Sequence, residues 1–103
     1  MIDFSQLDAV IHEKGRLAIV TLLASRSRPW PFPELRDELG LSDGNLITHL
    51  RTLEAAGYAH SEKESGPGRP RTLYALTPAG QAAFRRYLDL LGRLVDSSRQ
   101  KKI

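Results

Sequence analysis

The sequence contains no cysteine among its 103 residues, so it offers neither disulfide bonds nor thiolate ligands for a metal ion. It also lacks a long apolar run, because the longest one, Leu17 to Ala24, has eight residues and is too short to cross a bilayer. Three acidic residues, Asp3, Asp8 and Glu13, precede this run, which is unlike the basic start of a secretory signal peptide. We therefore expect a cytoplasmic protein without a membrane partner.

The signatures of catalysis are missing as well. The sequence has no G-x-S-x-G or H-E-x-x-H motif. The segment SGPGRPR, Ser65 to Arg71, is rich in glycine but lacks the lysine followed by serine or threonine that a phosphate-binding loop requires. The histidines, His12, His49 and His60, are far apart in the sequence and lack the spacing of metal ligands. We therefore predict no enzyme activity, no metal site and no cofactor.

What the sequence does contain is the composition of one globular domain and an uneven charge. Of its residues, 41% are hydrophobic and 26% are charged, and the net charge is +3. Residues 1–68 carry seven basic and ten acidic residues (net −3), whereas residues 69–103 carry eight basic and two acidic ones (net +6). A basic half favours a polyanionic partner, most simply nucleic acid, but a solvated basic helix and tail explains it equally well.

Hydrophobic spacing and capping residues predict four helices before a β-hairpin. The first helix is capped by Asp3 or Ser5, and the second spans residues 16–25. A proline-rich connector, residues 25–33, leads to a third helix that starts at Pro33 and is ended by Gly40. Ser42 caps a fourth helix, residues 43–56, which Gly57 stops. Four apolar residues at helical spacing mark the first helix: Phe4, Leu7, Val10 and Ile11.

The second half of the chain predicts the hairpin and one more helix. Two strand-like segments, residues 58–65 and 71–77, flank the glycine- and proline-rich loop. In the second strand Tyr74 and Leu76 point to the same side, which we expect to be the core. Thr77 followed by Pro78 is a cap and first-turn signal for a last helix that runs to residue 97 or 98.

Residues 33–58 follow the pattern of a helix-turn-helix, whose second helix lies in the major groove of DNA. At about 100° per residue, one arc of that helix is apolar. It consists of Leu46, Leu50, Leu53 and Gly57. The opposite arc carries short, hydrogen-bonding or cationic residues: Gly44, Thr48, Arg51, Thr52 and Ala55, with Asn45 at its edge. A solvated amphipathic helix also has a polar face, although it normally carries glutamate and lysine there.

These segments together resemble a known family. LGLSDGNLITHLRTLEAAGY, a charged hairpin, RPRTLYALTPAG and a long helix are similar to the winged-helix transcriptional regulators, in particular the small single-domain group related to MarR and ArsR regulators. The resemblance runs from about Leu7 to Val95. It implies one domain over residues 1–103 that is mainly α with a small β-hairpin (α+β), a winged helix-turn-helix with a long C-terminal helix.

The resemblance also implies a function and a set of contacts. Residues 43–56 would be a recognition helix in the major groove of double-stranded DNA, and residues 58–76 a wing on the minor groove or backbone. The implied DNA contacts are Ser42, Asn45, Thr48, His49, Arg51, Thr52, Lys63, Arg69 and Arg71. The family usually forms homodimers through its first and last helices. The implied dimer contacts are Leu7, Val10 and Ile11 with Tyr87, Leu88, Leu91, Leu94 and Val95.

Several residues allow two interpretations. His49 lies at the rim of the apolar arc and either packs there or touches a phosphate. Trp30 either binds an effector or, with Phe32, covers an end of the core. The C-terminal apolar stripe is either internal core or a dimer seam. A small-molecule effector is a further candidate partner, but no residue identifies it, and the absence of cysteine argues against metal sensing of the ArsR type.

The loop between the strands adds a hypothesis about specificity. Its GRP core resembles the AT-hook, in which arginine enters the narrow minor groove of A·T-rich DNA, so Arg69 is a candidate for insertion. The rival class is a winged-helix module that binds another protein instead of DNA. A protein-binding variant would have little reason to keep Arg51, Arg69 and Arg71 free of acidic neighbours, which argues against this rival. Glu62 and Glu64 on the first wing strand weaken that argument, because they place negative charge near the wing.

Overall fold

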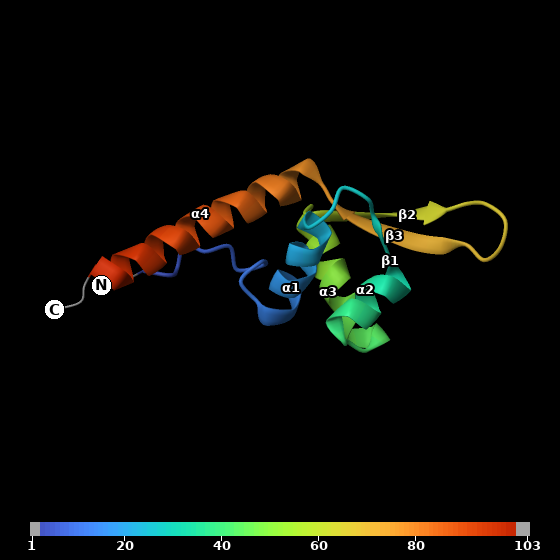
Figure 1. Cartoon of the computed structure of the whole chain (residues 1–103), viewed down its shortest axis with the longest axis horizontal. Coiled ribbons are helices and arrows are strands. Elements are labelled where there is room, and N and C mark those ends of the chain that lie inside the picture. The colour runs from blue at the N-terminus through green and yellow to red at the C-terminus, as the bar shows by residue number, and fades with distance from the viewer. Residues whose placement is uncertain (1–2, 101–103) are drawn as a thin grey trace.

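Four helices and a three-stranded antiparallel sheet make up residues 3–100, the part of the chain that the computed structural model describes (Figure 1). This arrangement confirms the predicted α+β winged-helix class with a long C-terminal helix. The strands lie in the order β1-β3-β2. The elements are α1 (Lys14–Ala24), β1 (Trp30–Pro31), α2 (Phe32–Leu39), α3 (Asp43–Ala55), β2 (Ala59–Glu64), β3 (Arg71–Leu76) and α4 (Pro78–Gln100).

The helix-turn-helix forms where its capping residues predict it. Gly40 ends α2 with a φ of 66°, a left-handed conformation that glycine adopts at little cost. The Ser42 side chain accepts a hydrogen bond from the backbone N–H of Asn45 at 3.2 Å and so caps α3. Gly57, with a φ of 80°, turns the chain out of α3. Local signals therefore fix both ends of α3.

The prediction of a helix near the N-terminus is wrong. Residues 3–13 form a series of turns, and the helix that follows begins at Lys14. The Asp8 carboxylate accepts hydrogen bonds from the backbone N–H groups of Val10 (2.9 Å) and Ile11 (3.2 Å), and this local bonding competes with the helical pattern. Leu7 and Ile11 still reach the core, but through turns.

The proline-rich connector contains a strand that the sequence did not reveal. Trp30 pairs with Tyr74, and Pro31 pairs with Leu73, so β1 adds an edge to the wing sheet. The Trp30 ring is buried, and its Nε1–H donates a hydrogen bond to the Leu22 carbonyl at 2.9 Å. The interpretation of Trp30 as a core residue is therefore confirmed. In the hairpin, Tyr74 and Leu76 are buried as predicted.

Two apolar clusters hold the domain together. The larger one lies among α1, α2, α3 and the sheet, and the smaller one joins Leu7 and Ile11 to Ala83 and Tyr87 of α4. α4 reaches Gln100, two or three residues beyond the predicted end. It runs away from the other helices, with the N-terminal segment near it (Figure 1). None of the helices in residues 3–100 is both long and apolar enough to span a membrane.

Candidate nucleic-acid interface

The exposed side of α3 is small, polar and free of acidic side chains after its first residue. Leu46, Leu50 and Leu53 are fully buried, as predicted, so the opposite side faces outward. We call this outer side the reading face; it comprises Gly44, Asn45, Thr48, Arg51, Thr52 and Ala55. The Thr48 and Thr52 hydroxyls donate to carbonyl oxygens one turn earlier, at 2.9 and 3.2 Å, so their oxygens remain available as acceptors.

The acidic side chains in and near α3 accept hydrogen bonds from neighbouring side chains. Asp43, in the first turn, accepts a hydrogen bond from Arg36 Nη1 at 3.1 Å, and Arg36 Nε bonds Asp37 at 3.0 Å. These carboxylates raise the pKa of the Arg36 guanidinium, Asp37 more than Asp43. Glu54 is half-buried and accepts from the Ser61 hydroxyl of β2 at 3.3 Å. Arg51 makes no ion pair with the described residues, so it is the cation on the reading face that is free to bind.

The wing extends beyond the rest of the domain and ends in an exposed loop (Figure 1). Gly68, with a φ of 97°, gives this loop a conformation that other residues rarely adopt. Arg69 and Lys63 are exposed and make no ion pair within residues 3–100. Arg71 instead pairs with Glu64 across the strands, with 2.6 Å between Nη2 and Oε1. The wing therefore presents two free cations and one that is paired.

His49 does not lie with the other predicted DNA contacts. Its ring packs over Gly15 at the start of α1, where a Cβ would lie 2.6 Å from His49 Nε2. Its Nδ1 atom is buried and lies 3.6 Å from the Glu13 carboxylate. This placement favours the interpretation of His49 as a packing residue beside the buried seam over that of a phosphate contact. Nothing near His49 in the sequence indicates Gly15 as its neighbour.

Part of the predicted dimer set is internal core. Leu7, Ile11 and Tyr87 are buried within one chain, and the Tyr87 hydroxyl lies 2.6 Å from His12 Nδ1. These three residues have almost no surface to offer a partner, which corrects their assignment to a dimer interface. Val10, Leu91 and Leu94 are half-buried. Leu88 and Val95 are 48% and 42% exposed.

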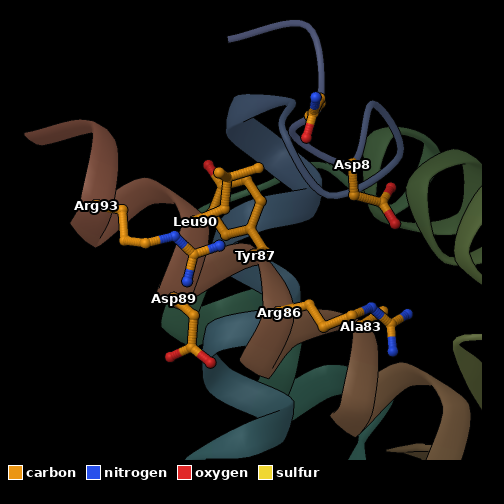
Figure 2. A pocket seen from close by; sticks show the side chains of 8 residues that line it. Asp8, Ala83, Arg86, Tyr87, Asp89, Leu90 and Arg93 are labelled. Carbon is orange, nitrogen blue, oxygen red and sulfur yellow. The ribbon is translucent and has the colours of Figure 1, made fainter. Parts of the chain in front are cut away.

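A cavity of about 370 Å³ lies between the N-terminal segment and α4 (Figure 2). Asp8 comes from the N-terminal segment, whereas Arg86, Asp89 and Arg93 come from α4. Two acidic and two basic side chains therefore surround the space, so its charge favours neither an anion nor a cation. No group of three or more potential metal ligands occurs in residues 3–100.

Comparison with known proteins supports the same winged-helix architecture. A family model described as a winged helix DNA-binding domain matches residues 16–95. Transcriptional regulator Rv3488 of Mycobacterium tuberculosis is 43% identical over 70 residues, which cover 64% of this chain and 65% of the relative. The chain spans less than two thirds of the length of the curated relatives that it matches, 62% and 65%.

Two solved structures resemble this chain in both fold and sequence. The transcriptional regulator homologue protein from Pyrococcus horikoshii OT3 is 33% identical with a TM-score of 0.80, over 85% of this chain and 86% of that one. A transcriptional regulator of the MarR family from Enterococcus faecalis V583 is 30% identical with a TM-score of 0.72, over 89% of this chain and 81% of that one.

Proposed function

Because this chain belongs to the winged helix DNA-binding domain family, as the resemblance predicted, we propose that it binds a specific double-stranded DNA site as a homodimer and regulates transcription there. The reading face of α3 carries this proposal. Its small side chains leave space for base edges, and its one cation is unpaired. The solved relatives are transcriptional regulators, one of them of the MarR family.

In the proposed complex α3 lies in the major groove. Arg51 donates two hydrogen bonds to a guanine, or binds a phosphate, and Asn45 can pair with an adenine edge. Thr48 and Thr52 contact bases or the backbone. Ser42, at the positive end of α3, lies where a phosphate is favoured. These residues would supply the sequence specificity.

The wing would bind the adjoining minor groove or backbone. Arg69 in the exposed loop and Lys63 on β2 carry unpaired positive charge. Glycine on both sides of Pro67 lets the loop approach a backbone closely. Glu64 weakens this surface less than its charge suggests, because Arg71 neutralises it.

The proposed dimer uses the exposed apolar stripe of α4. Leu88 and Val95 lie about two turns apart on one side of the helix, with Leu91 and Leu94 beside them. A second copy would cover apolar surface that is otherwise exposed to water. A two-fold dimer would present two α3 helices to successive major grooves about 34 Å apart.

Selection of bound sequences from random duplex DNA, at two salt concentrations, tests this function. We expect enrichment of an inverted repeat with half-sites about 10 base pairs apart. The enriched site should hold its sequence at both salt concentrations, although binding weakens at the higher one. A selection that enriches nothing at either concentration would refute specific DNA binding and support the protein-binding alternative.

A further inference from the structure

Five charged side chains surround a small cavity between α2 and the wing strands. Three are arginines and two are glutamates, so the set carries one net positive charge. The cavity has a volume of about 240 Å³ and lies between the first turn of α2 and the ends of β2 and β3 nearest the loop. The charged residues are Arg26, Arg28, Glu34, Glu64 and Arg71. Of these, only Arg71 belongs to the predicted DNA contacts.

Arg26 is fixed in the wall of this cavity. Its Nη1 atom bonds Glu34 at 2.8 Å, and its Nη2 atom donates to the Pro29 carbonyl at 3.2 Å. Its guanidinium also stacks over the Trp30 ring, 3.8 Å from the centroid. Arg26 therefore orders the turn before β1 and has little capacity left for a ligand.

Arg28 and Arg71 have that capacity. The Arg28 side chain is exposed and makes no ion pair with any residue from 3 to 99. Arg71 pairs with Glu64, but the two side chains are 51% and 44% exposed, and such a surface pair exchanges for another anion at small cost. All three arginines line the cavity. The hydrogen bond from Arg26 lowers the pKa of the Glu34 carboxyl, and the charges of Arg26, Arg28 and Arg71 lower it further.

We propose that this cavity binds a phosphate of the DNA backbone, with Arg28 as the principal donor and Arg71 leaving Glu64 to join it. The proposal rests on the proposed DNA binding. In a helix-turn-helix complex the first helix, here α2, crosses the phosphate backbone while the second, α3, lies in the major groove. The cavity lies between α2 and the wing, and arginine matches phosphate geometry. This contact would position the protein without reading a base.

Binding measurements on Arg28→Ala test this site. We expect affinity to fall by roughly tenfold, to a similar degree on the selected site and on unrelated duplexes. The slope of log affinity against log salt should decrease by about one for each protomer. Arg85→Ala removes an exposed arginine from α4 and serves as the control for loss of charge alone. Because Arg28 is exposed, its variant should keep the parent's melting temperature. An affinity and salt slope equal to those of Arg85→Ala would overturn the proposal.

DNA in which one phosphate is replaced by an uncharged group locates the phosphate that this cavity binds. Duplexes with a single methylphosphonate, stepped along the strand between the two grooves, should reveal one position where the substitution weakens binding by the parent clearly more than binding by Arg28→Ala. A matched pair of charge variants adds a second measurement: Glu64→Gln frees Arg71 and should strengthen binding more than Glu62→Gln, which changes the same charge on the same strand. Equal effects of every methylphosphonate on both proteins would refute the site. A parent that binds no duplex would instead refute the proposed function itself.

Discussion

Gly80, in the first turn of α4, is the position where one added methyl group tests how α4 joins the domain. A Cβ at Gly80 would lie 2.0 Å from the Tyr58 carbonyl oxygen and 2.8 Å from the Tyr58 carbonyl carbon. Ordinary contacts begin at 3.4 Å, so α4 or the chain at Tyr58 would have to move by about 1.4 Å, the difference between 3.4 and 2.0 Å. Backbone, unlike the end of a side chain, does not yield this distance cheaply.

The cost of Gly80→Ala follows from what that movement disturbs. The Thr77 N–H donates to the Tyr58 carbonyl at 3.0 Å, and the Gly80 N–H donates to Thr77 Oγ1 at 2.9 Å. Weakening both hydrogen bonds costs about 1 kcal/mol each. Overpacking adds about 1–3 kcal/mol, and the better helix propensity of alanine returns about 1 kcal/mol. We therefore expect the free energy of unfolding to fall by about 2–4 kcal/mol.

Thermal unfolding followed by circular dichroism measures this loss, with all proteins at one concentration because a dimer's melting temperature depends on it. The melting temperature of Gly80→Ala should fall by at least about 8 °C. Gly44→Ala is the control: it adds the same methyl group to a helix where nothing lies within 4 Å, and it should not lower stability. A Gly80→Ala protein as stable as the parent would show that α4 does not approach Tyr58 so closely.

Three further predictions concern DNA binding and assembly. Arg51→Ala should weaken the free energy of binding to the selected site by about 1–3 kcal/mol and relax specificity at one base position. Unchanged affinity for that site would show that the reading face is not part of the interface. Arg69→Ala should weaken binding to all duplexes and flatten the salt dependence, whereas a slope equal to the parent's would exclude it from the contacts. Glutamate at both Leu88 and Val95 should convert the proposed dimer to a folded monomer in analytical ultracentrifugation, and a persisting dimer would place the interface elsewhere.

The helix-turn-helix could be predicted from the sequence because its determinants are local. Ser42 caps α3 through a residue only three positions away, and Gly40 and Gly57 stop their helices through their own backbone conformations. Tyr74 and Leu76 are two positions apart in a strand, so they point to the same side, and both are buried as predicted. In these elements the residues that determine the structure are close neighbours in the sequence, and the prediction and the structure agree.

The errors arise where the cause lies far away in the sequence. Residues 3–13 have helical spacing, but Asp8 bonds its own neighbours and the Tyr58 hydroxyl, fifty positions away, and the segment folds as turns around those bonds. β1 has only two residues, too few to show a periodic pattern. It forms because Trp30 pairs with Tyr74 of β3. His49 turns inward because Gly15 leaves it space. No window of neighbouring residues contains the contacts of Asp8 with Tyr58, Trp30 with Tyr74, or His49 with Gly15.

The base of the wing is closed by its own bonds. Besides the Thr77 N–H bond to the Tyr58 carbonyl, the Thr77 hydroxyl donates to the Gly57 carbonyl at 2.6 Å, so both ends of the hairpin are tied together before α4 begins. Residues 65–70 beyond the strands are all exposed. The loop is thus a replaceable part: doubling its length costs only about 0.6 kcal/mol of closure entropy. Evolution can exchange SGPGRP for another tip, and a protein engineer can do the same, without moving α3 or α4.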